Sequence, residues 1–356
     1  MKRAHAGSLV SFFVATFCVA QSVAAAANYT AANQVDVRLD AAIYHKLGDE
    51  HFQAGRYREA VEAFKQLIKL RSDVPQGHFS LGRAHYKLKQ YAEAVVAFKE
   101  AVRLKPDFYA AHVHLGNALD STGQFAEAVA AYKEAARLQP DNPTAHYELG
   151  VASFNRKQYA EAEAAYREVV RLKPDYKGAH DNLGETLSRL GRTKAAVAAY
   201  LEAVRLNPND AEAYRHLGDA RGKLKQYADA EAAYREAARL RPGDADAQLG
   251  LGNVYFNTKR FAEAAAAYRE AARLRPTWAT AHNYLGDAYK QAAKPAEAVA
   301  AYREAVRLSP TLADVHYKLA LVYLERNERA AALKTHETLR TLNPDLAAKL
   351  KAALDK

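Results

Sequence analysis

The fold is decided by a repeated unit whose clearest copy, residues 109–142, reads YAAHVHLGNALDSTGQFAEAVAAYKEAARLQPDN. Nine tandem copies occupy residues 41–344 without an insertion, the ninth being two residues shorter than the others. The seventh and eighth positions are Leu-Gly in eight copies and Leu319-Ala320 in the ninth. An alanine follows each leucine at a fixed spacing, and four positions further on comes a Phe or Tyr, or His336 in the ninth copy. A fixed period of this kind indicates a stacked repeat architecture.

Each copy predicts two helices joined by a short turn that contains Gly or Lys. In the copy quoted above, we expect the first helix, helix A, over residues 109–122 and the second, helix B, over residues 125–138. Alanine and glycine at the helix crossing allow the two backbones to approach, and the aromatic column fills the remaining gap. A proline near the end of most copies stops helix B. The aspartates that follow it are predicted N-caps of the next helix A: Asp107, Asp141 and Asp175.

These residues closely resemble the tetratricopeptide repeat, whose 34-residue unit is a pair of antiparallel helices. The resemblance implies an all-α fold, an α-solenoid in which nine helical hairpins form a superhelical stack. Residues 345–356 are expected to form a C-terminal capping helix, because a repeat array must cover its last apolar face. The resemblance further implies a concave groove lined by the first helices, where partner peptides or helices bind.

Residues 1–27 have the pattern of a signal peptide, and residues 28–40 are expected to form a linker. Lys2 and Arg3 precede a short apolar run, and small residues end the segment, where cleavage is expected. The chain is therefore predicted to be exported to a periplasmic or secreted location, without a transmembrane span after cleavage. The alternative is an uncleaved signal that anchors the protein in a membrane.

The nine internal copies can be compared with one another to find a candidate binding surface. Positions 2, 5, 9, 12 and 13 of the repeat lie on the side of helix A opposite its apolar positions and vary between copies. Aromatic and amide side chains there suit an extended peptide, although some of the rings could instead pack on the neighbouring helix. The predicted peptide-binding residues are Phe79, Arg83, Tyr86, Val113, Asn117, Tyr147, Val151, Phe154, Asn253, Phe256, Asn257 and Asn283.

Two further groups of polar residues allow alternative interpretations. Asp181, Glu185 and Arg189 in repeat 5 and Arg215, Asp219 and Lys223 in repeat 6 are expected to pair as a solvated ladder, or else to clamp a charged ligand. Histidine recurs at position 4 of six repeats, but ligands in successive repeats are a whole helix pair apart and cannot converge on one metal ion. The histidines are therefore interpreted as half-buried polar residues, and no metal or cofactor is expected.

The formal charge of +10 arises from 51 Lys and Arg against 41 Asp and Glu. Much of the excess lies on helix B, where arginines alternate with glutamates, a pattern typical of a solvated surface. We predict a non-catalytic protein-protein interaction scaffold with no role in nucleic-acid binding, since the uninterrupted period leaves no loop to build an active site. The alternative is a binding module for an anionic polysaccharide or another cell-envelope polymer. The partner's identity and the oligomeric state stay open.

Overall fold

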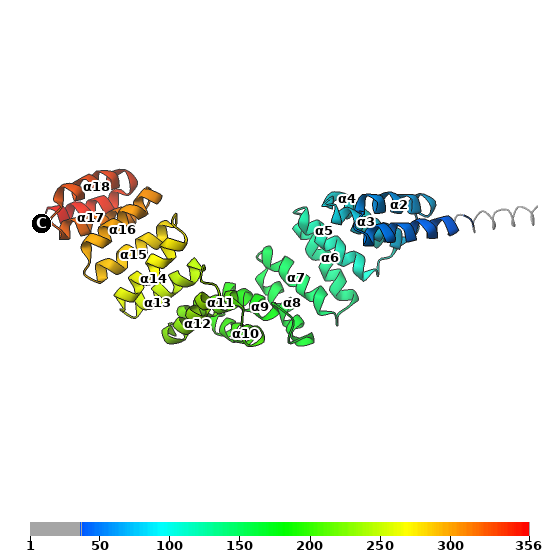
Figure 1. Ribbon diagram of the computed structural model, residues 1–356, viewed down its shortest axis with the longest axis horizontal. Coiled ribbons are helices and arrows are strands. Elements are labelled where there is room, and N and C mark those ends of the chain that lie inside the picture. The colour runs from blue at the N-terminus through cyan, green and yellow to red at the C-terminus, as the bar shows by residue number, and fades with distance from the viewer. Residues whose placement is uncertain (1–35, 37, 356) are drawn as a thin grey trace, which may run out of the picture. The chain divides into compact units, whose positions relative to one another are not determined.

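The computed structural model describes residue 36 and residues 38–355, and all of the regular secondary structure in these residues is helical. Residues 38–53 form the first helix. The remaining A helices alternate with the B helices along the chain (Figure 1). The A helices are α3 (Pro75–Lys87), α5 (Tyr109–Ser121), α7 (Pro143–Asn155), α9 (Ala179–Arg189), α11 (Ala211–Lys223), α13 (Ala245–Asn257), α15 (Ala279–Gln291) and α17 (Ala313–Glu325).

The B helices all have the same length, and most of them share one charge pattern. In α6, for example, Glu127 lies in the first turn and Arg137 in the last, where each complements the helix dipole. The B helices are α2 (Tyr57–Leu70), α4 (Tyr91–Leu104), α6 (Phe125–Leu138), α8 (Tyr159–Leu172), α10 (Thr193–Leu206), α12 (Tyr227–Leu240), α14 (Phe261–Leu274), α16 (Pro295–Leu308) and α18 (Arg329–Leu342). The predicted all-α solenoid of helical hairpins is thus confirmed.

The helices form two compact units, one ending at Gln158 and the other beginning at Tyr159. Within each unit, consecutive helices pack side by side. The C-terminal helix α19 (Pro344–Leu354) packs on α17 and α18 and buries Ala347, Leu350 and Leu354. It therefore covers the last hairpin in the way expected of a capping helix.

The tight A–B turn uses the left-handed backbone region at the same position of every repeat. Glycine occupies this position in some repeats, as at Gly123 (φ +77°), and lysine in others, as at Lys89 (φ +60°). A side chain disfavours this conformation, so each lysine turn must be held by the packing of the two helices that it joins.

The predicted N-caps Asp107, Asp141 and Asp175 were wrong. The N-cap residues of the next helices are Phe108, Asn142 and Gly178, because each helix begins later than the aspartate position. Where a side chain does cap helix A, it comes from the residue directly before the helix: the Asp210 carboxylate accepts from the backbone N–H groups of Glu212 and Ala213.

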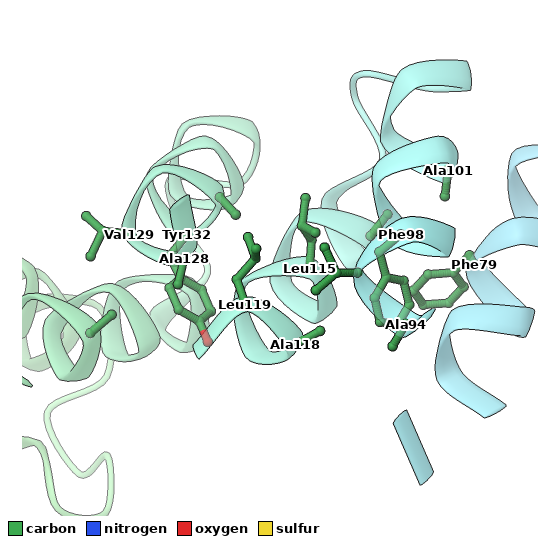
Figure 2. Packing of buried hydrophobic residues seen from close by; sticks show 14 residues of the cluster. Phe79, Ala94, Phe98, Ala101, Leu115, Ala118, Leu119, Ala128, Val129 and Tyr132 are labelled. Atoms are coloured by element: carbon green, nitrogen blue, oxygen red, sulfur yellow. The ribbon is translucent and has the colours of Figure 1, made fainter. Parts of the chain in front are cut away.

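In repeats 1–3 and 5–8, the core of the hairpin is the contact between the aromatic ring of helix B and the Leu-Gly glycine of helix A. Phe64, Phe98 and the tyrosines of this column are buried. At Gly116, a Cβ atom would lie only 2.6 Å from the ring of Tyr132, so no larger residue fits without moving the ring. Figure 2 shows Phe98 packed with Phe79 at one end of a cluster whose other end holds Tyr132. The regular spacing of leucine, glycine and aromatic residue in the sequence therefore arises from one repeated contact, between the glycine of helix A and the ring of helix B.

Two helical glycines of the second unit test this contact. Gly286→Ala places a Cβ 2.5 Å from the Tyr302 ring, whereas Gly222→Ala meets only the Tyr234 hydroxyl at 4.0 Å. We expect Gly286→Ala to lower the free energy of unfolding by about 1–3 kcal/mol through overpacking. Gly222→Ala should raise it by about 0.5–1 kcal/mol, because alanine is the better helix former. Urea unfolding followed by circular dichroism measures both, and equal effects of the two changes would refute the contact.

Candidate functional site

The candidate site is the variable surface of the A helices, which we call the A-helix face: positions 2, 5, 9, 12 and 13 of each repeat. Eight of the predicted residues lie on α3, α5 and α7 in the first unit, and four lie on α13 and α15 in the second. Each group therefore belongs to its own unit.

Phe79 does not lie open on this face. Only 6% of it is exposed, and its ring lies 4.9 Å from the Phe108 ring and 5.3 Å from the His114 ring, measured between centroids. The ring is long enough to reach across to α5, so it fills the gap between adjacent hairpins. The expectation that Phe79 is exposed was therefore wrong, and its role is to pack the core.

Arg83 and Tyr86 are half-buried, and both contact other side chains of the protein. The Arg83 guanidinium lies 4.4 Å from the centre of the Phe52 ring, a cation–π contact. The Tyr86 ring packs edge-on against Tyr91, and its hydroxyl lies 3.5 Å from that of Ser121. Both side chains are thus held in place while part of their surface remains accessible, which lowers the entropy cost of binding a partner.

A small pocket of about 100 Å³ brings together three predicted residues of the first unit, Tyr86, Asn117 and Val151. Asn117 accepts a hydrogen bond of 2.6 Å from the Tyr132 hydroxyl through Oδ1. The pocket also contains Asp120 and Glu148, which the sequence analysis missed. Burial, together with the charge of Asp120, raises the pKa of Glu148.

The other predicted residues of the first unit do not line this pocket. Val113 packs against a cluster of alanines from α6 and α7, and so contributes mainly to the contact between hairpins. Tyr147 and Phe154 are half-buried on α7. In the first unit, therefore, some of the predicted residues pack between the helices, and others remain partly accessible to solvent.

In the second unit, Asn253 and Asn257 lie together on α13 and line a pocket of about 410 Å³. Asn253 accepts a hydrogen bond of 2.8 Å from the Tyr268 hydroxyl, and Asn257 donates its side-chain N–H to the backbone oxygen of Asn253 at 2.7 Å. Phe256 lies outside the set of residues that line this pocket and packs edge-on against Phe261.

Asn283 lies on α15 and accepts a hydrogen bond from Lys318, a residue that was not predicted from the sequence. Lys318 of α17 donates to Asn283 Oδ1 at 3.2 Å and to Asp287 Oδ2 at 2.7 Å. Asp287 also accepts from the Tyr302 hydroxyl at 2.7 Å. The predicted asparagines of the second unit therefore lie in two places: Asn253 and Asn257 at the pocket on α13, and Asn283 in the network around Lys318.

The residue types at position 9 and in the aromatic column of the sequence could have identified the hydrogen bonds from the tyrosine hydroxyls to position 9. Position 9 accepts a hydrogen bond from the tyrosine of helix B in the pairs Asn117–Tyr132, Asp219–Tyr234, Asn253–Tyr268 and Asp287–Tyr302. In repeat 2, where the ring is Phe98 and has no hydroxyl, position 9 is Arg83. Part of the variation on the A-helix face therefore follows from the need to satisfy a buried hydroxyl.

The charged rows of repeats 5 and 6 pair mainly within each helix. Arg189 contacts Glu185 at 3.2 Å and Arg215 contacts Asp219 at 3.3 Å. Two hydrogen bonds link α9 and α11 instead: one of 3.0 Å between His216 Nδ1 and Asp181, and one of 3.2 Å from Lys223 to the Ser188 hydroxyl. The expected pairing between the two rows was thus wrong in its partners, because i,i+4 neighbours are closer than residues on the adjacent helix.

The position-4 histidines each bond to the loop before their own helix. His112 Nε2 lies 2.8 Å from the carbonyl oxygen of Pro106, and the same bond recurs along the chain, as at His146 and His180. Within the described residues, no three His, Cys, Asp or Glu side chains are grouped closely enough to hold a metal ion. The recurring histidines therefore have a structural role, because each one links helix A to the loop that precedes it.

The His216–Asp181 bond makes a pH-dependent contribution to stability. Burial lowers the pKa of His216, but the hydrogen bond to Asp181 and the charge of that carboxylate together raise it above the usual 6.5. Because the pKa of His216 is higher in the folded protein than in the unfolded chain, protonation of His216 stabilises the fold. This contribution is complete at pH values below the pKa in the unfolded chain, and it is lost as the pH rises through the pKa in the folded protein.

We expect the urea midpoint of the wild type to exceed that of His216→Gln by more at about pH 5.5 than at about pH 9. Unfolding curves of both proteins across this range measure the difference. A difference that stays constant or grows toward high pH would contradict the assignment.

Comparisons with known proteins agree with the geometry. Residues 6–248 match the family described as Cilia and flagella-associated protein 70 C-terminal domain, residues 223–287 match Tetratricopeptide repeat, and residues 295–327 match TPR repeat. No curated protein sequence matches the chain.

Among solved structures, the C-terminal part of a TPR repeat-containing protein from Cytophaga hutchinsonii is 18% identical, with a TM-score of 0.58 over 67% of this chain and 98% of its own. A tetratricopeptide repeat protein from Parabacteroides merdae is also 18% identical, with a TM-score of 0.52 over 70% of this chain and 99% of its own. These likenesses show a shared fold. The chain belongs to the tetratricopeptide repeat family.

Proposed function

We propose that the chain is a non-catalytic scaffold that binds a peptide segment or helix of another protein on its A-helix face. The observation that carries this proposal is the contrast between the two sides of helix A. One side repeats the same glycine–ring contact, as at Gly116 and Tyr132, in repeat after repeat. The other side presents different accessible groups in each repeat and contains pockets at Tyr86 and at Asn253. Variable chemistry on a constant frame suits selective recognition of another chain.

A scaffold rather than an enzyme is supported by the construction of the array. The repeat period is never interrupted, so the turns between the helices are too short to enclose a substrate. The strongly shifted pKa values of the tyrosine column, such as the raised pKa of Tyr132, result mainly from burial in the core. They mark packing positions rather than an acid–base site.

A protein partner is favoured over an anionic polymer by the pairing of the basic residues. The arginines near the ends of the B helices are held by glutamates one turn earlier, as in Arg103–Glu100 at 2.7 Å and Arg307–Glu304 at 2.6 Å. These pairs neutralise one another locally, which weakens any long-range attraction for a polyanion.

An extracytoplasmic location is part of the proposal. It is supported by the sequence of residues 1–27, which lie outside the described residues, with their basic start, apolar run and small-residue end. Within the described part of the chain, none of the helices combines the length and the apolar character needed to span a membrane.

Site-specific photocrosslinking tests the binding face. A benzoylphenylalanine at Ser121, an exposed residue beside Tyr86, should give adducts with a protein partner in the native host. The matched control is the same group at Val96, which is 69% exposed on the B helix α4. The proposal expects specific adducts from Ser121 only. Equal labelling from both positions, or adducts from Val96 alone, would place binding elsewhere.

Export is tested by sequencing the N-terminus of the protein purified from its native host. We expect the mature chain to begin near residue 28, because the small residues Val23 to Ala27 form the predicted cleavage region. Fractionation should find this species outside the cytoplasm. A cytoplasmic chain that retains the whole predicted signal segment would rule out export.

A further inference from the structure

The most distinctive feature of the second unit is a pocket between the A helices α11 and α13. Its volume is about 410 Å³, within the range of about 300–1,000 Å³ found for ligand pockets. All of the residues that line it come from α11, α12 and α13. They are Asp219, Gly222, Lys223, Tyr227, Tyr234, Gly250, Asn253, Val254 and Asn257.

The pocket forms where two successive repeats have glycine at positions that carry a side chain in the other repeats. Gly222 occupies position 12, where four of the other repeats have an aromatic ring: Phe52, Tyr86, Phe154 and Phe256. Gly250 occupies position 6, which carries bulkier residues in the other repeats. Glycine inside a helix is unfavourable relative to alanine, and a Cβ at Gly222 would meet nothing closer than 4.0 Å. Packing within the chain therefore does not require glycine at position 12 of this repeat.

In three other repeats, the residue at position 6 is an aromatic ring that lies over the column ring of the preceding repeat. His114 stacks on Phe98, His216 lies over Tyr200 and Tyr284 lies over Tyr268, with centroid distances of 5.6, 5.5 and 5.6 Å. Each is a flat ring that the following repeat places against the column ring of the preceding one. Gly250 supplies no such ring for Tyr234. A Cβ at Gly250 would lie 2.4 Å from the Tyr234 ring, so this ring itself packs against the glycine, and the pocket opens beside it.

The charges at the pocket favour a neutral guest. Asp219 accepts from the Tyr234 hydroxyl at 2.6 Å and pairs with Arg215 at 3.3 Å. Lys223 donates to the Ser188 hydroxyl at 3.2 Å. One negative and one positive group, each with a partner inside the protein, give little net attraction for an ion. The floor and walls are formed by the glycine backbones, Val254 and the rings of Tyr227 and Tyr234, which suit an apolar or aromatic group.

The edge of the pocket is complementary to a peptide bond. The Oδ1 of Asn253 is occupied by the Tyr268 hydroxyl, which leaves the Asn253 side-chain N–H groups as donors. The side-chain N–H of Asn257 is bonded to the Asn253 carbonyl, which leaves Asn257 Oδ1 as an acceptor. Both asparagines are exposed. The Asn253 side-chain N–H can donate to the backbone C=O of a bound residue, and Asn257 Oδ1 can accept from its backbone N–H, while the side chain of that residue enters the pocket.

We propose that this pocket is the anchor subsite of the binding face and holds one aromatic side chain of an extended partner segment. The inference rests on the proposed function, since it specifies which feature of the bound peptide the second unit recognises. The guest ring lies beside Tyr227, in the place that the position-12 rings Phe52, Tyr86 and Phe256 fill beside the aromatic residue five positions later in their own repeats. The asparagine pair binds the backbone beside it.

The test uses N-acetyl-tryptophan amide as the probe, and selective ¹⁵N labelling of glycine and asparagine in the full chain. We expect the probe to shift the backbone resonances of Gly222, Gly250 and Asn253, with a dissociation constant of about 1 mM, typical of a fragment of this size. N-acetyl-alanine amide, which has the same backbone and no ring, should cause no comparable shift. Equally strong binding of the arginine or glutamate derivative would overturn the choice of an aromatic guest.

Gly222→Phe is the decisive variant, because it restores the ring that several other repeats carry at position 12 and fills the pocket. It should weaken probe binding at least tenfold. Gly222→Ala, which keeps most of the space, should change binding less than twofold. Lys290→Phe adds the same ring at position 12 of repeat 8, outside the pocket, and should leave binding unchanged. Undiminished probe binding by a folded Gly222→Phe protein would overturn the inference.

Failure of this inference can be told apart from failure of the proposed function. If Ser121 crosslinks a partner but the tryptophan probe does not shift the pocket resonances, the anchor subsite is refuted and the scaffold function stands. If the probe binds in the pocket with the expected response to Gly222→Phe, but the A-helix face crosslinks no protein, the pocket's affinity for an aromatic group stands and the scaffold function is refuted.

Discussion

The structure depends on one close contact, the aromatic ring of helix B resting on the glycine of helix A. A Cβ at Gly48, Gly184 or Gly252 would approach the facing ring to between 2.4 and 2.6 Å, so this glycine can be replaced only if the ring moves. The contact sets the distance between the two helices of a hairpin, and its recurrence in each repeat gives the hairpins the same shape. Dense packing of this kind tolerates little change in volume.

The same contact links the core to the candidate binding face. Since most of the column rings are tyrosines, their hydroxyls reach the far side of helix A and need an acceptor there. Asn117, Asp219, Asn253 and Asp287 provide it. A polar residue at position 9 can therefore serve the fold and still offer its remaining polar atoms to a partner. Binding groups that are held in this way are pre-organised, which favours selective recognition.

The sequence predicted the fold well because the period, the leucine, the glycine and the ring report contacts that are local and identical in nearly every copy. The accessibility of the A-helix face was predicted less well, because exposure at a given repeat position depends on the neighbouring repeat. Phe79 is buried since Phe108 and His114 lie within its reach, whereas Asn253 borders a pocket since Gly250 and Gly222 lack side chains. The glycines at position 12 of repeat 6 and position 6 of repeat 7 were visible in the sequence, but their effect depends on the packing of α11 against α13.

The division between the packed column and the accessible face is tested most directly by hydroxyl-radical footprinting of the free protein. Oxidation of each aromatic residue would be measured by mass spectrometry. The account predicts slow oxidation of Tyr132, Tyr268 and Tyr302, which are buried, and faster oxidation of the half-buried Tyr86 and Phe256. Oxidation of the column tyrosines at the rate of Tyr86 would show that the rings do not rest on the glycines, and would contradict the account.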